Sequence, residues 1–350
     1  MNEQKGEKRP PRHWARIVLV SIVALLVIGT GIVLVPRDSG APAAIPFSET
    51  ARSSAFEDAL SLRDSASSLA ASPAPGVGAD TWTASVTLLT THARALFMPA
   101  ASGSATAASS LASVAGPTAA SFIADLAASG RKRLEDAKES DAGIARLLAA
   151  VGTSQVLDAE RLAKLLKLPA PAAEQVTNAT ASAQGQASCP SVSPTPAPTE
   201  ATTDAALAAA VRFEHQAVYV HQVALKRLDA SAAVTASKGL DMHERLLEQA
   251  ESLTRINCGD VPTREAGYSL PTQFAADPAA SLGALEADSL PVFGDLVALS
   301  TGPMREWSMD ALLAAARRGA AWGAALPSLP GLTLDVGNLP QLPSPTTGRG

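Results

Sequence analysis

The sequence AALAAAVRFEHQAVYVHQVALKRL, residues 205–228, decides how the rest of the chain is interpreted. It predicts one helix, because apolar residues recur at helical spacing and share one stripe: Leu207, Val211, Val218, Leu225 and Leu228. Glu214 and His221 fall on the same stripe. A carboxylate and an imidazole on a buried face must be hydrogen-bonded, paired or bound to a metal. The helix is therefore expected to carry a polar site in the core of its domain.

Three further amphipathic stretches follow this helix and complete a predicted four-helix bundle over residues 204–326. Their starting points are expected at about Ala232, Pro278 and Gly302. Asp204 is expected to cap the first helix, and Asp277 before a proline is the usual arrangement at the start of the third. Short loops between the four helices favour antiparallel neighbours.

The region before this bundle, residues 37–168, is expected to form another antiparallel four-helix bundle. Breaker residues divide it into helical pieces at about 48–71, 80–98, 117–139 and 141–168. Helix formers dominate, aromatic residues make up only 4% of the chain, and alternating strand patterns are absent from the sequence. The folded part is therefore predicted to be all-α. His92 lies on an apolar stripe and is expected to be a hydrogen-bonded core residue.

Residues 17–35 read IVLVSIVALLVIGTGIVLV, an uncharged run of nineteen residues that is long enough to span a bilayer. A basic tail, residues 1–16, precedes the run, so the positive-inside rule places the N-terminus in the cytoplasm and everything after Pro36 outside. We expect a single-pass anchor in the plasma membrane, residues 17–36. A cleaved signal peptide is the alternative, because the small residues from Gly40 to Ala44 resemble a peptidase site.

A linker rich in Pro, Ala, Ser and Thr, residues 169–203, separates the two predicted bundles and is expected to be disordered. The sequence has two cysteines: Cys189 lies in this linker, and Cys258 follows the second helix of the next bundle. Both fall on the side assigned to an oxidising compartment, so a disulfide between them is favoured. Two free thiols or a bridge between molecules are the alternatives.

The second bundle resembles a ferritin-like domain family of unknown function found in actinobacterial envelope proteins. Three segments carry the resemblance: FEHQAVY from Phe213 to Tyr219, HER from His243 to Arg245, and the Ala-rich last helix that ends in Trp322. The resemblance covers about residues 205–322. It implies a ferritin-like four-helix bundle in an extracytoplasmic protein, and it implies no assigned activity.

The first region shows a short internal similarity to the second. The pair Phe56–Glu57 precedes His92 as the pair Phe213–Glu214 precedes His243, and in each case the histidine lies on the next helix. Two such short matches arise easily in Ala-rich helices. The similarity therefore gives only weak support for a degenerate ferritin-like bundle in the first region.

The polar stripe also offers side chains that could bind a metal. Di-iron carboxylate bundles use a Glu from each of two helices and Glu-x-x-His from each of the other two. Both Glu-x-x-His motifs are missing: Leu240 stands three residues before His243, and the fourth helix has no histidine. A paired-iron site is therefore not expected, and no cofactor is assigned. A single metal ion held by Glu214, His221 and His243 is the alternative to a buried hydrogen-bonded pair or triad, which polar core positions more often form.

Residues 327–350 form a Pro-rich tail in which prolines recur too densely for a helix. Its leucines make it more apolar than a free tail needs to be: Leu329, Leu332, Leu334, Leu339 and Leu342. We therefore expect part of the tail to pack against the helices or against a partner.

Net charge and motifs exclude several classes of function. The net charge of -5 argues against nucleic acid as a partner. The sequence contains no phosphate loop and no nucleophile elbow, so no catalytic residue is assigned. The preferred interpretation is a non-catalytic interaction or structural module with a partner in the cell envelope. A metal-binding or oxidoreductase ferritin-like protein and a small-molecule binder with a cleft between bundles are the alternatives.

Overall fold

The computed structural model describes residues 45–73, 77–98, 116–171, 189 and 201–343. The predicted cytoplasmic tail and membrane span, and most of the predicted linker, lie outside these residues. Within the described ranges, no helix combines the length and the apolar character that crossing a membrane requires. The membrane anchor therefore stays a prediction.

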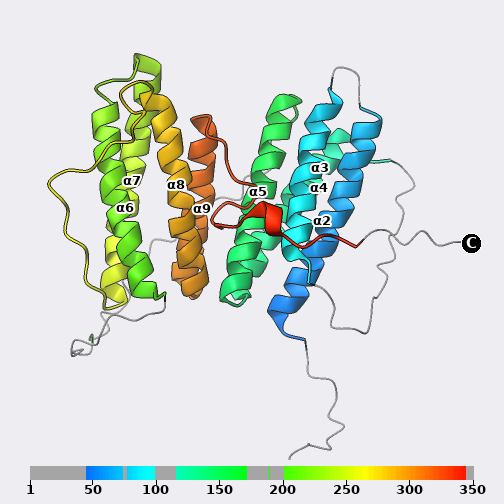
Figure 1. The fold of residues 1–350 in the computed structure, drawn as a ribbon, viewed down its shortest axis with the longest axis horizontal. Coiled ribbons are helices and arrows are strands. Elements are labelled where there is room, and N and C mark those ends of the chain that lie inside the picture. Colours follow the sequence, from blue (N-terminus) through cyan, green and yellow to red (C-terminus); the bar gives the residue numbers. More distant parts are fainter. Residues whose placement is uncertain (1–44, 74–76, 99–115, 172–188, 190–200, 344–350) are drawn as a thin grey trace, which may run out of the picture. The chain divides into compact units, whose positions relative to one another are not determined.

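The described residues fold into helices, as predicted, and Figure 1 shows them as two neighbouring groups of upright helices. The first group contains α2 (Phe47–Ala71), α3 (Ala79–Leu96), α4 (Ala119–Glu139) and α5 (Ala142–Leu165). The second contains α6 (Thr203–Ala224), α7 (Ala230–Ile256), α8 (Pro278–Leu299) and α9 (Gly302–Ala321), and a 3-10 turn, η1 (Val336–Asn338), follows. The all-α prediction is confirmed.

Consecutive helices pack in pairs, α2 with α3, α4 with α5, α6 with α7, and α8 with α9. The pairs then combine, α2 against α4 and α6 against α8, which is consistent with the two predicted helical bundles. Gly130 and Gly152 explain the close approach of α4 and α5. A Cβ atom built on Gly152 would lie 2.7 Å from the carbonyl oxygen of Gly130, so only glycine fits this crossing.

The cap of α6 differs from the prediction. The Thr202 side chain accepts a hydrogen bond from the Ala205 amide, so Thr202 is the N-cap and Asp204 is not. Asp204 instead lies in the first turn, where its carboxylate accepts a hydrogen bond from the Asn257 side chain. Asp277 caps α8 as predicted, because its Oδ1 accepts a hydrogen bond from the Ala280 amide at 2.9 Å.

The two groups of helices are in contact, which could not be predicted from the sequence. Helix α5 packs against both α8 and α9, and α4 also contacts α9. One hydrophobic cluster runs through both groups and includes Leu148 of α5 and Phe293 of α8. The described residues from Pro46 onward accordingly form one compact unit.

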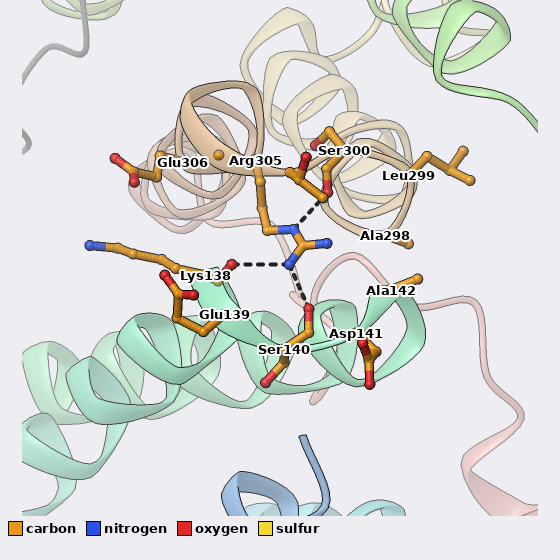
Figure 2. Close-up of a pocket in the computed structure, with 12 residues that line it drawn as sticks. Lys138, Glu139, Ser140, Asp141, Ala142, Ala298, Leu299, Ser300, Arg305 and Glu306 are labelled. Atoms are coloured by element: carbon orange, nitrogen blue, oxygen red, sulfur yellow. Dashed lines mark hydrogen bonds between the residues drawn. The ribbon is translucent and has the colours of Figure 1, made fainter. Parts of the chain in front are cut away.

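Arg305 of α9 fastens the two groups together, as Figure 2 shows. Its Nε donates to the carbonyl oxygen of Ser300 at 2.8 Å, just beyond the end of α8. Its Nη1 donates to the carbonyl oxygens of Ser140 at 2.6 Å and Lys138 at 3.1 Å, at the end of α4. A cation among the last carbonyls of a helix is stabilised by hydrogen bonds and by the helix dipole. Arg305 therefore caps one helix from each group with a single side chain.

The first part of the tail packs against the helices, which confirms that prediction for the described residues up to 343. Leu329 is buried in the shared hydrophobic cluster. The Gly331 carbonyl oxygen accepts a hydrogen bond from Arg146 of α5 at 2.7 Å. Arg94 of α3 donates to the Pro340 carbonyl oxygen at 3.0 Å. Leu334 is an exception, because it remains exposed.

Candidate functional site: a buried charge network

Each helix of the second group contributes one side chain to a polar cluster in its core. Glu214 comes from α6, His243 from α7, Glu286 from α8 and Arg318 from α9. The side chains of Glu214, His243 and Glu286 are 0% exposed. Charged groups at this depth are stable only when each has a partner of opposite charge and its hydrogen bonds are made.

The cluster forms a continuous chain of contacts with His243 at its centre. His243 Nδ1 donates to Glu214 Oε2 at 2.8 Å, and Nε2 donates to Glu286 Oε1 at 3.2 Å. Arg318 donates two hydrogen bonds to Glu286, from Nε to Oε1 at 2.6 Å and from Nη2 to Oε2 at 2.9 Å. Two carboxylates therefore face one imidazolium and one guanidinium. Hereafter these four residues are called the charge network.

The pKa values follow from these contacts. Burial by itself would lower the pKa of His243, but its hydrogen bonds to Glu214 and Glu286 outweigh burial and raise the pKa to about 9. Burial would raise the pKa of Glu286, but the hydrogen bond from His243 and the charge of Arg318 lower it to about 2. At neutral pH His243 is therefore a cation and Glu286 an anion.

His221 lies beside the network without joining it. Its ring centroid is 4.6 Å from that of His243, and its Nδ1 donates to the Ala217 carbonyl oxygen at 3.0 Å. Burial, and then the positive charge of His243, lowers the pKa of His221 to about 4, so this ring is neutral. Gly239 of α7 makes room for it, because a Cβ atom there would lie 2.7 Å from His221 Nε2.

The structure buries all three predicted residues and pairs two of them. Glu214, His221 and His243 all lie in the core, as expected. Of the expected pair or triad, the structure contains the pair of Glu214 and His243, and no hydrogen bond links His221 to either residue. Arg318 was missed, because the Ala-rich last helix carries two adjacent arginines and the sequence does not indicate which one turns inward.

The donor set does not fit a paired-iron centre. Helix α9 contributes the cation Arg318 where a di-iron bundle needs further carboxylate or histidine donors. A single ion is chemically closer, since His221, His243 and Glu286 offer ligand atoms within 4.8 Å of one another. Such an ion would have to displace the proton of His243 and compete with Arg318 for Glu286. In its favour, Glu214 Oε1 and His221 Nε2 are buried at this position and have no hydrogen-bond partner among the described residues.

The first group of helices does not repeat this site. Glu57, the counterpart of Glu214 in the internal similarity, is exposed, whereas Glu214 is fully buried. His92 is fully buried as predicted, but its Nε2 donates to the Ser328 carbonyl oxygen of the tail at 3.0 Å. Burial lowers the pKa of His92 to about 4, and the hydrogen bond to Ser328 only partly offsets this. The sequence similarity therefore does not extend to a common polar site.

The predicted disulfide is present. Cys189 and Cys258 are bonded with a Cα–Cα distance of 5.5 Å, across a sequence separation of 69 residues. Cys258 follows the end of α7 directly and has a positive φ of 59°. The bond therefore ties the segment before α6 to the far end of α7.

The structure also contains a cleft whose lining includes none of the four residues of the charge network. Its walls are built by α3, α5, the end of α9 and the tail, and its volume is about 950 Å³. Thr87, Leu157 and Ala320 represent the three helices in its lining, and Pro327 represents the tail. Arg305 is one of the residues that line a smaller cavity of about 490 Å³ (Figure 2).

Comparison with known proteins identifies a family for the second group of helices and nothing for the chain as a whole. No curated protein and no solved structure matches the sequence. The matched family is described as a domain of unknown function. The match includes the whole charge network and the first residues of the tail. Residues 206–334 carry a domain of unknown function (DUF4439).

Proposed function

We propose that the protein is a membrane-anchored, extracytoplasmic module of the cell envelope, and that it acts by interaction and not by catalysis. On this proposal the second group of helices is a ferritin-like bundle, which the resemblance of residues 205–322 supports. A partner in the envelope then recognises the outer surfaces of the helices, and the core serves to hold those surfaces in place.

The observation that carries the non-catalytic part is the composition of the charge network. In di-iron bundles, bound cations neutralise the inward-facing carboxylates. Here His243 and Arg318 supply that positive charge from the chain itself. Both nitrogens of His243 and both oxygens of Glu286 are already engaged. A charge-balanced network whose members are bonded to one another in this way favours a structural role, in which the four helices are held in one register.

The disulfide supports the extracytoplasmic location. Structural disulfides persist in oxidising compartments and are rare in the cytosol. Cys189 and Cys258 both follow the uncharged run at residues 17–35, which agrees with the orientation that the positive-inside rule predicts.

Metal analysis tests the non-catalytic part. The full-length protein is purified, equilibrated by dialysis with micromolar Fe(II), Mn(II) or Zn(II), and analysed for bound metal. We expect far less than one ion per chain. One ion per chain that is lost in Glu286→Gln and kept in Asp288→Asn would contradict the proposal, because Asp288 is an exposed carboxylate on the same helix. That result would favour a metal-binding or oxidoreductase protein.

A reporter fusion tests the location. Alkaline phosphatase, which is active only outside the cytoplasm, is joined to the C-terminus of the full chain. We expect an active fusion in the membrane fraction, and an inactive fusion when residues 17–35 are deleted. An inactive full-length fusion would contradict the extracytoplasmic orientation, and release of the active fusion into the medium would favour a cleaved signal peptide.

The cleft between α3, α5 and the tail favours a second candidate function, the binding of a small molecule. Its volume of about 950 Å³ lies at the upper end of the roughly 300–1,000 Å³ typical of ligand sites. Ligand sites are mostly apolar with a few polar groups, and the lining of this cleft has that character.

A further inference from the structure

The cleft has three walls of different origin. Regularly spaced residues of α3, from Ala84 to Thr91, form one wall, and residues of α5 from Ser154 to Lys164 form the second. The third wall is the end of α9 with the segment from Ala320 to Pro330, and Val336 adds to it. The α5 wall alone extends over eleven residues, about 15 Å along a helix axis. The cleft is therefore elongated along α5.

Most of the surface that lines the cleft is apolar, and small or medium-sized side chains form it. Alanine, leucine, proline and valine side chains provide it: Ala84, Leu88, Leu157, Ala320, Ala321, Ala324, Leu326, Pro327, Pro330 and Val336. Among these, Ala84, Ala320 and Ala321 are exposed, and so are Pro327 and Val336. Apolar surface of this extent is stabilised when a ligand removes it from water.

Positively charged residues outnumber negatively charged ones in the lining of the cleft by one. Asp158 pairs with Arg161 at 2.6 Å, and Glu160 pairs with Arg317 at 2.6 Å. Lys164 is the fifth charged residue of the lining, and no anionic partner for it is found within the described ranges. Lys164 is exposed and lies in the last turn of α5, so the cleft carries one surplus positive charge at this end.

We propose that this cleft binds an amphiphile with one long acyl chain and one anionic head group, which deepens the second candidate function and rests on it. The acyl chain runs parallel to α5 and lies against Leu157 and the apolar residues of α3 and of the segment from Ala320 to Pro330. The head group lies at Lys164, with Arg161 next to it, where a single negative charge balances the surplus positive charge. Neither ion pair of the cleft has to be broken for this arrangement.

The geometry favours a single chain over a compact polar ligand. A sugar or a nucleotide needs several polar partners along its length, but the charged side chains of the cleft other than Lys164 are already paired. A chain of methylene groups needs none, and its affinity grows with each methylene that leaves water. An anchor in the membrane would also keep the cleft close to a source of acyl chains, as the run at residues 17–35 predicts.

Photo-crosslinking of the full-length protein in phosphatidylcholine nanodiscs tests this inference. The probe is palmitate that carries a diazirine on its chain, and labelled peptides are identified by mass spectrometry. We expect saturable labelling within α3, within α5 or between Arg317 and Val336. Unlabelled palmitate should compete at least tenfold better than hexadecanol, which has the same chain and no charge.

Two matched pairs of variants locate the site. Ala320→Trp fills the cleft and should reduce labelling at least tenfold, whereas Ala284→Trp places the same side chain at an exposed helical alanine of α8 outside the lining and should not. Lys164→Gln removes the surplus charge and should weaken competition by palmitate about tenfold, whereas Lys238→Gln on α7 should not. Melting curves confirm that each variant is folded.

Three outcomes overturn the inference: labelling that does not saturate, labelling confined to residues 17–35, or equal loss in Ala320→Trp and Ala284→Trp. A thermal-shift screen of other small molecules separates the two proposals. A ligand of another class that stabilises the protein but not Ala320→Trp would overturn the amphiphile and leave the second candidate function standing. If no ligand of any class stabilises the protein more than it stabilises Ala320→Trp, both the amphiphile proposal and the second candidate function fail.

Discussion

The two groups of helices share an architecture, but a buried histidine in each, His243 and His92, is held in opposite ways. In the second group the four members of the charge network are linked to one another by hydrogen bonds across all four helices. In the first group His92 depends on a carbonyl oxygen of the tail, Ser328, which lies outside the group. The comparison shows that an inward-facing histidine in an Ala-rich bundle has no fixed role, and that its partners decide its charge.

The difference has a physical origin in the helices themselves. His243 is close to two carboxylates, so its pKa rises to about 9 and it carries a charge. His92 faces a neutral carbonyl oxygen, so burial prevails and its pKa falls to about 4. One histidine therefore holds helices together as an ion, and the other as a neutral hydrogen-bond donor. The following predictions test this contrast.

The largest expected effect comes from removing the central cation. His243→Leu keeps the side-chain volume but leaves the carboxylates of Glu214 and Glu286 buried with too little positive charge. We expect a loss of about 3–5 kcal/mol in the free energy of unfolding, measured with urea. His92→Leu leaves only a carbonyl oxygen without its donor and should cost about 1–3 kcal/mol. Equal losses in the two variants would contradict the contrast between the groups.

Arg305 tests how strongly the two groups depend on each other. Arg305→Ala removes the cap from the ends of α4 and α8 together, and we expect a loss of about 3 kcal/mol. The control is Arg255→Ala, which breaks only the exposed pair with Glu251 and should cost about 0–1 kcal/mol. Amide hydrogen exchange should show faster exchange at the ends of α4 and α8 in Arg305→Ala. Unchanged exchange there would mean that the groups are held together by other contacts.

The contact between tail and helices is tested at a glycine. A Cβ atom on Gly294 of α8 would lie 2.1 Å from the Gly331 carbonyl oxygen, so Gly294→Ala should displace the tail and cost about 1–3 kcal/mol. Limited proteolysis should then cleave the tail faster. Gly143→Ala, in open space on α5, should be neutral or stabilise the protein by up to about 1 kcal/mol. Equal cleavage in both variants would contradict the packing of the tail.

The dependence of stability on pH should separate the histidines. His243 has a pKa raised from 6.5 to about 9, so its stabilisation is complete below pH 6.5 and is lost as the pH rises through 9. His92 and His221 have pKa values lowered to about 4, so their contribution is complete above pH 6.5 and is lost as the pH falls through 4. Urea unfolding should therefore show maximal stability near pH 6.5.

Variants show which histidine causes the loss of stability at alkaline pH and which causes the loss at acid pH. His243→Leu should flatten the alkaline limb, and His92→Leu should flatten part of the acid limb. An alkaline limb that survives in His243→Leu would show that another group causes it.

The helices could be predicted from the sequence because their signals are local. Breakers such as Pro99 and Pro327 and the apolar period placed most helix ends within a few residues, although Thr202 replaced Asp204 as a cap. The pairing of Glu214 with His243 was also foreseeable, because both lie on apolar stripes and a buried charge needs a partner.

The remaining features depend on contacts between distant parts of the chain. Arg305 meets Ser140, which is 165 residues away, and no local pattern marks it. Arg318 differs from Arg317 by one position, but Arg318 turns to Glu286 and Arg317 to Glu160 of the first group. The packing of α5 against α8 and α9 decides these directions, and it arises only in the folded protein.

The charge of His243 tests the central claim most directly. The chain has five histidines, so nitrogen-15 labelling of histidine alone gives a spectrum that His243→Gln can assign. We predict that both ring nitrogens of His243 keep their protons from neutral pH up to about pH 9, as an imidazolium between two carboxylates does. A ring of His243 that is neutral at pH 7, or whose nitrogen signals change on addition of Zn(II), would contradict the account.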